Sequence, residues 1–98
     1  MTVDFEKNGT ALKVAVGGRL DTLSAAELEE QLEPELEDVE SIELDLEKLE
    51  YISSAGLRVI LCLIKEMEGR GEFKVTNVTP EVMDILEVTG FINLLNIE

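Results

Sequence analysis

The chain has 98 residues, 45% of them hydrophobic, which is enough for one domain with a modest, mostly aliphatic core. Its 22 acidic residues outnumber its 8 basic ones, and the net charge of −14 argues against nucleic acid and anionic membrane surfaces as partners. It has no histidine and one cysteine, Cys62, which excludes Ser-His and Cys-His nucleophilic sites, His-ligated metals and an intramolecular disulfide.

No apolar run approaches the roughly 18 residues of a membrane-spanning helix, and the N-terminus lacks a signal-peptide pattern. We therefore expect a cytoplasmic protein, without a metal ion or cofactor. Acidic residues are concentrated between positions 27 and 50, where twelve acids accompany one base, Lys48. Such a run is usually a solvated face, and its functional interpretation is electrostatic steering towards a basic partner.

An antiparallel hairpin is predicted at the N-terminus. Apolar and polar residues alternate in residues 2–7 and again in residues 10–16. Between them, Asn8-Gly9 is the strongest two-residue hairpin signal that a sequence offers. Residues 17–21, which begin with two glycines, are expected to leave the sheet because glycine permits backbone angles closed to other residues.

A helix is predicted to follow. Ser24 and Glu27 fit a capping box, with the serine at the N-cap and the glutamate three residues later. Pro34 cannot donate a hydrogen bond to the preceding turn and disfavours a helical Glu33. We expect the helix to end or kink near Glu33.

The middle of the chain is predicted to contain a strand at residues 41–46, a loop at 47–50 and a helix at about 54–68. The strand shows alternating apolar residues, and the helix has apolar residues that recur at intervals of three and four. The members of that apolar helix face are Leu57, Ile60, Leu61 and Ile64, extended by Leu63 and Met67.

Three more elements are predicted after Gly69-Arg70-Gly71, which ends the helix. Residues 73–75 form a short strand, and Thr79-Pro80 begins a helix that Thr89-Gly90 ends. Residues 94–97 form a short strand or a packed extension. This order predicts one α/β domain spanning residues 1–98, with a mostly parallel mixed sheet of four to five strands, an N-terminal antiparallel hairpin and helices packed on it.

The candidate site is the stretch Tyr51-Ile52-Ser53-Ser54-Ala55-Gly56-Leu57-Arg58, where small residues lie between a strand and the start of a helix. The first turn of a helix has free N–H groups and a partial positive charge, and small side chains allow a close approach. On the helical wheel Arg58, Val59 and Cys62 lie opposite the apolar face. They are either scattered exposed residues or a partner surface continuous with Ser54.

Asp21 has two interpretations. It orders the turn after the glycine pair, or it lies beside the serine stretch as an acidic neighbour. The predicted partner-binding set is Asp21, Ser53, Ser54, Ala55, Gly56, Arg58, Val59 and Cys62.

Three motifs follow one another along the chain: Gly18-Arg19-Leu20-Asp21, then Asp45-Leu46 with Tyr51-Ile52-Ser53-Ser54-Ala55-Gly56-Leu57, and finally Thr79-Pro80-Glu81-Val82 through Thr89-Gly90-Phe91. In this order and at this spacing they resemble the STAS-domain anti-sigma factor antagonists. The resemblance covers nearly the whole chain and implies the STAS fold. It also implies partner switching, in which the unmodified antagonist binds an anti-sigma factor that is a serine kinase and so frees a sigma factor.

In that family the kinase phosphorylates one serine, which abolishes binding, and a PP2C-type serine phosphatase reverses the modification. The matching residue is Ser54. The family usually has an aspartate just before that serine, whereas this chain has Ser53, which is therefore a rival acceptor.

Two other functions compete. A STAS-like regulatory subunit of a transport or other signalling complex would bind a nucleotide or ATPase partner constitutively and would be indifferent to charge at Ser54. An enzyme with Ser54 as nucleophile would need Lys48 or Lys65 as its base, since histidine is absent. We do not expect an enzyme.

Overall fold

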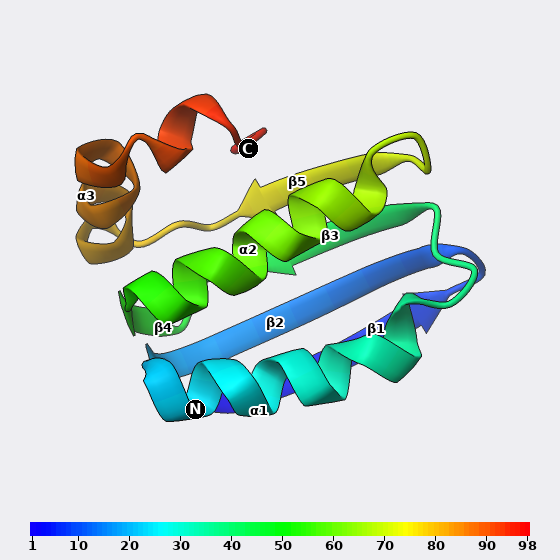
Figure 1. The fold of residues 1–98 in the computed structure, drawn as a ribbon, viewed down its shortest axis with the longest axis horizontal. Helices are drawn as coiled ribbons and strands as arrows, with labels where there is room; N and C mark the ends of the chain where they lie inside the picture. Colours follow the sequence, from blue (N-terminus) through cyan, green and yellow to red (C-terminus); the bar gives the residue numbers. More distant parts are fainter.

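The sheet is built around β2 (Ala11–Leu20), which pairs with three other strands in the computed structural model of residues 1–98 (Figure 1). The other elements in chain order are β1 (Thr2–Asn8), α1 (Thr22–Leu32), the 3₁₀ helix η1 (Glu33–Leu36), β3 (Ser41–Asp45), β4 (Leu49–Ile52), α2 (Ser54–Met67), β5 (Glu72–Thr76), α3 (Pro80–Thr89) and the 3₁₀ helix η2 (Phe91–Asn93). Only β1 and β2 are antiparallel; β3 and β4 pair with β2, and β5 pairs with β3, all in parallel. The predicted mixed, mostly parallel sheet is confirmed, with five strands.

The two faces of the sheet differ in polarity. In β2 and β3, buried aliphatic residues alternate with more exposed polar ones, so each strand has one apolar side. Helices α1 and α2 lie side by side on the apolar face (Figure 1). The core therefore lies between these two helices and the sheet. No helix is long and apolar enough to cross a membrane.

The hairpin is confirmed, but its turn lies one residue later than predicted. Asn8 is still paired with Ala11, so the two loop residues are Gly9 and Thr10. Gly9 has a φ of +64°, a left-handed conformation that glycine adopts without strain.

Residues 17–20 stay in the sheet, contrary to the prediction, and only Asp21 leaves it, as the N-cap of α1. β2 continues to Leu20 because it changes partner, from β3 to β4, and the register shifts between Gly18 and Arg19. Gly18 has a φ of +83° at that shift. The predicted loop at residues 47–50 is also wrong in part, since Leu49 begins β4.

Helix α1 begins at Thr22, earlier than predicted, and its N-cap is Asp21 rather than Ser24. Ser24 is instead the third helical residue, and the capping box links it to Asp21. The predicted end near Glu33 is confirmed, because the chain tightens there into η1 with Pro34 in its first turn.

Helix α2 buries two sides, and this corrects the predicted position of Val59. Its side chain is only 4% exposed, because α1 packs beside α2 and covers it. Leu61 and Ile64, which were expected in the core face, are only half-buried. Cys62 is exposed, as predicted.

The C-terminal segment matches one of its two predicted forms. Thr79 caps α3, Pro80 is its first residue, and Gly90 ends it in the left-handed conformation. The last residues form a packed extension with a single bridge from Ile97 to Val75, rather than a strand.

The burial of Val59 predicts that Val59→Glu lowers the free energy of unfolding by about 3 kcal/mol or more, because it places an unpaired carboxylate between two helices. Cys62→Glu adds the same charge on the exposed side of α2 and should change stability by less than about 0.5 kcal/mol. Urea denaturation of both variants measures the difference. Equal midpoints would show that Val59 does not pack against α1.

Candidate functional site

Helices α1 and α2 begin next to each other at one edge of the sheet. Leu20 and Ile52, the last residues of β2 and β4, are direct partners in parallel register. The backbone N–H of Ser53 donates a hydrogen bond to the carbonyl of Leu20 over 2.8 Å. Since both strands run in the same direction, Asp21 and Ser53, which follow them, emerge as neighbours at this edge.

The two adjacent serines have different roles in the structure. Ser53 is the N-cap of α2, and its hydroxyl oxygen accepts a hydrogen bond from the backbone N–H of Gly56 over 3.2 Å. This bond satisfies one of the free N–H groups of the first turn. Ser54 is the first residue of the helix, and it is exposed.

Gly56 is buried, so its role is packing rather than direct contact with a partner. A Cβ atom at this position would lie 2.7 Å from Cγ1 of Ile52 and 2.9 Å from Cγ of Leu20. These distances are too short for a real side chain. The glycine therefore lets the start of α2 lie directly on β2 and β4, which fixes the position of Ser53 and Ser54.

Asp21 satisfies both of its predicted interpretations. It orders the turn, because its carboxylate accepts a hydrogen bond from the backbone N–H of Ser24 over 2.9 Å. The hydroxyl of Ser24 lies 2.9 Å from the same carboxylate and 2.9 Å from the carbonyl of Arg19. Asp21 also follows the strand that is paired to the serine stretch.

Donation from Ser24 lowers the pKa of Asp21 below its usual 3.8, mainly through the backbone N–H and then through the hydroxyl. Desolvation opposes this shift and is smaller. The carboxylate at this edge is therefore held in its charged form.

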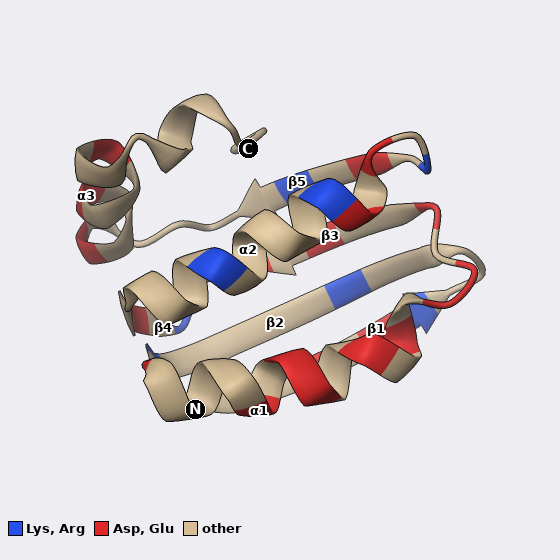
Figure 2. Ribbon diagram, viewed as in Figure 1, with Lys and Arg blue, Asp and Glu red and all other residues tan.

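Two cations lie close to the serines in sequence or register. The guanidinium of Arg19 is 4.4 Å from the centre of the Tyr51 ring, and these two residues are partners between β2 and β4. Arg58 is exposed and lies four residues after Ser54, one turn along the same helix. It is the only cation in the first two turns of α2 (Figure 2).

The structure brings together Asp21, Ser53, Ser54, Ala55 and Arg58, with Cys62 exposed one further turn along α2. Val59 and Gly56 do not belong to this surface because both are buried.

The sequence analysis missed Leu23, which is 73% exposed in the first turn of α1. A large exposed aliphatic residue beside the candidate site offers apolar surface to a partner. Placing the helix start at Ser24 left Leu23 outside the predicted helix.

Comparisons with known proteins agree on one family. The family model of the STAS domain matches residues 2–98. A Bordetella bronchiseptica protein named as an anti-sigma factor antagonist, BtrV, is 32% identical over 96 residues, covering 96% of this chain and 83% of the relative. The anti-sigma-B factor antagonist of Staphylococcus aureus is 31% identical over 87 residues, covering 87% of this chain and 81% of the relative.

The fold is similar to that of the anti-sigma factor antagonist SpoIIAA of Bacillus, which has been solved in two forms. The unphosphorylated form superimposes with a TM-score of 0.84 at 18% identity, covering 99% of this chain and 88% of that one. The phosphorylated form superimposes with a TM-score of 0.76 at 17% identity, covering 99% of this chain and 91% of that one.

The lowered pKa of Asp21 predicts a pH-dependent contribution to stability. A carboxylate whose pKa is lower in the folded state stabilises the fold above its unfolded pKa, and this contribution is lost as pH falls through the folded value. Asp21→Asn keeps a good cap without the charge. The variant should therefore melt at a lower temperature than the parent at neutral pH, and the gap should narrow as pH falls below 3.8, the usual pKa of the carboxyl group.

Thermal denaturation across this pH range measures the gap. Asp84→Asn, an exposed acid in the middle of α3, is the control for the loss of one negative charge. A gap for Asp21→Asn that does not change with pH would contradict the assigned role of the charge.

Proposed function

The chain belongs to the STAS-domain family of anti-sigma factor antagonists, and we propose that Ser54 is the phosphorylation switch through which it acts. In its unmodified form, the protein binds an anti-sigma factor that is also a serine kinase, and the sigma factor is released. The kinase phosphorylates Ser54, which ends the complex. A PP2C-type serine phosphatase restores the binding form.

The observation that carries this proposal is the different environment of the two serines. The oxygen of Ser53 is engaged in capping α2, and the residue is half-buried. Ser54 is exposed at the first position of the helix, where a kinase can reach its hydroxyl. This favours Ser54 over Ser53 as the acceptor.

The position of Ser54 also supports a switch that leaves the fold intact. A phosphate adds about −1.5 to −2 charges, and a negative charge near a helix N-terminus gains roughly 0.3–1 kcal/mol. Arg58, one turn along, adds a favourable charge on the same side of the helix. The modified protein should therefore stay folded.

The cost of phosphorylation falls on the complex. A surface shaped around a small neutral hydroxyl would have to desolvate a dianion without a matching partner group. Changing a complex from almost fully bound to almost fully free takes about 5.5 kcal/mol, and a buried unpaired phosphate is a sufficient source of it. Leu23 and Arg58 are the side chains we expect to contribute most to the unmodified interface, through apolar contact and charge respectively.

Ser54→Asp is expected to fold like the parent and to bind the kinase at least about 100-fold more weakly, because the carboxylate brings a charge into the interface. Ser54→Ala is the matched control, since it removes the hydroxyl without adding charge, and it should keep binding. The partner is captured from lysate of the source organism, identified as a kinase-like ATPase and titrated by calorimetry. Unchanged binding by Ser54→Asp would instead support a constitutive regulatory subunit.

The acceptor is tested separately by incubating single variants with the purified kinase and ATP. Ser54→Ala should take up no phosphate. Ser53→Ala should still be phosphorylated, although the loss of the N-cap should cost about 1 kcal/mol of stability. Mass spectrometry gives the phosphate count and its position. Phosphate on Ser53 in the parent protein would overturn the assignment.

A further inference from the structure

A groove runs between α1 and α2, from Val59 towards the C-terminal ends of both helices and so away from the edge that carries Ser54. It encloses a hollow of about 540 Å³. Its floor is apolar: Leu32, Val59 and Leu63 are buried there, and Leu36 is half-buried. The sides carry charged residues and Cys62, so an incoming segment would meet apolar atoms at the bottom and charges at the edges.

The charge on the sides of this groove is strongly one-sided. Its acidic residues are Glu29, Glu33, Glu37, Asp38 and Glu66. The only base is Arg70, which is already paired: its guanidinium donates to Glu66 over 2.8 Å and to the carbonyl of Leu36 over 2.8 Å. Figure 2 shows the acidic residues over the C-terminal half of α1 and the segment that follows it. Four of the five acids therefore have no lining cation to balance them; Lys7, which does not line the groove, donates to the backbone carbonyls of Glu35 and Glu37 over 3.5 and 3.3 Å.

The open face of the sheet carries a second hollow, which acids and bases line in equal number, so the excess of acids in the groove is a local feature. This hollow is lined by Glu6, Glu43 and Glu72 but also by Lys7, Lys13 and Lys74. The strand register even alternates the signs across the sheet, since Glu6 is paired with Lys13, Lys13 with Glu43, and Glu43 with Lys74. That face neutralises itself, whereas the groove does not.

The acids of the groove are also unfavourable for α1 itself. The C-terminal end of a helix carries partial negative charge and is stabilised by basic residues, yet the last turn of α1 contains none. Glu29 lies within that turn, and Glu33 is the C-cap. These carboxylates and the C-terminal end of α1 therefore repel each other, and a cationic partner would reduce this repulsion.

We propose that this groove binds a basic amphipathic helix of a partner protein. The aliphatic side chains of that helix lie on the floor formed by Leu32, Leu36 and Leu63, and its lysines or arginines face the acidic sides. Two helices packed side by side offer such a groove to a third helix, which contributes apolar anchors at helical spacing. A second copy of this chain is a poor occupant, because its own charge of −14 would meet acids of the same sign.

This surface is separate from the proposed switch. Ser54 begins α2, whereas the groove is lined by four residues of α2 between Val59 and Glu66, by Arg70 after that helix, and by the end of α1 and the segment that follows it. A partner in the groove would therefore not cover the serine, and its binding does not depend on whether Ser54 is phosphorylated.

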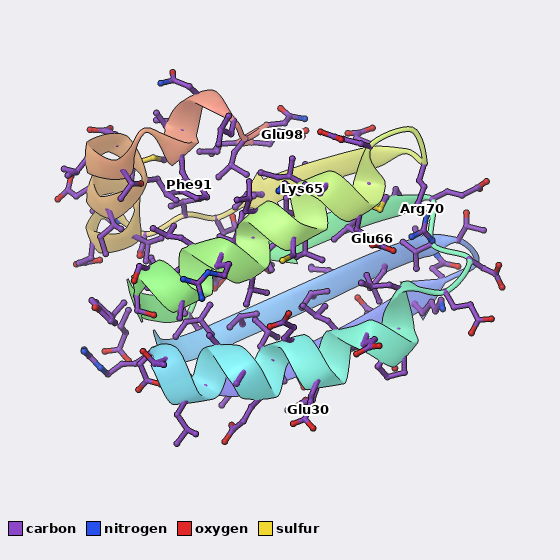
Figure 3. All side chains as sticks on the ribbon, viewed as in Figure 1. Glu30, Lys65, Glu66, Arg70, Phe91 and Glu98 are labelled. Carbon is purple, nitrogen blue, oxygen red and sulfur yellow. The ribbon has the colours of Figure 1, made fainter.

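The test uses a short fluorescent peptide of leucine and lysine, arranged as an amphipathic helix, and measures its affinity by anisotropy. Glu29→Lys/Glu33→Lys reverses two charges in the groove. The matched control, Glu27→Lys/Glu30→Lys, reverses two exposed charges that do not line it; Figure 3 shows Glu30 pointing away from α2, whereas Glu66 and Arg70 lie at the C-terminal end of α2. The groove pair should weaken binding by about tenfold and the control pair by less than about twofold.

Equal weakening by the two pairs would overturn the proposal, because it would mean attraction to the net charge alone. So would equal affinity for a peptide whose leucines are replaced by serine, since the floor would then play no part. Both pairs lie away from Ser54, so failure here leaves the proposed switch standing, and failure of the switch leaves this surface standing.

Cys62 provides an independent check of location, because it is the only cysteine and lines the groove. A leucine–lysine peptide that ends in a cysteine, supplied as its mixed disulfide with 2-mercaptoethanol, can exchange with this thiol and release 2-mercaptoethanol. The leucine–lysine peptide should be captured at least about tenfold more than the peptide of equal charge whose leucines are replaced by serine. Equal capture would contradict binding in the groove.

Discussion

The parallel pairing of β2 with β4 is the constraint on which the site depends. It brings Leu20 level with Ile52, and the bond from Ser53 to the Leu20 carbonyl fixes where each chain segment leaves the sheet. Both segments then turn into helices whose first residues lie at one edge. Gly56 makes this arrangement possible, since any side chain there would push α2 off the two strands.

At this edge, Ser53 has a structural role and Ser54 is accessible to solvent. One hydroxyl satisfies the backbone of α2, and the neighbouring one is left exposed on a helix whose direction is already set. A change at Ser54 therefore alters the charge of the surface without removing a bond that the fold uses. Had the exposed serine also been the cap, modification would have had to disrupt the helix start to act. This separation makes the proposed phosphorylation switch compatible with a domain that has only a modest core.

Much of this could be predicted from the sequence, because the signals were local. The hairpin, the start of α2 at the serines and the proline-initiated α3 each follow from a few adjacent residues. The failures share a different cause. Leu49–Ile52 is a strand only because β2 extends to meet it, and Val59 is buried only because α1 lies beside α2. A helical wheel describes one helix alone, so it cannot predict contacts with elements that are distant in the chain.

The acidic run between residues 27 and 50 is another feature whose spatial arrangement could not be predicted from the sequence. The sequence shows only that residues 27–50 are rich in acids, so it cannot say which surface would attract a basic partner. In the folded protein these acids lie in different places. Glu29 and Glu33 line the groove, whereas Glu27 and Glu30 do not. Glu43 lies on the sheet and is paired with Lys74 of the neighbouring strand. The pair α1–α2 then has two ends of opposite character. One presents free N–H groups, Arg58 and the exposed Ser54, and the other an apolar floor between unbalanced acids. Charge added at the first end is about a Debye length or more from the far end of α2, so the two proposals concern different ends of the same helix pair.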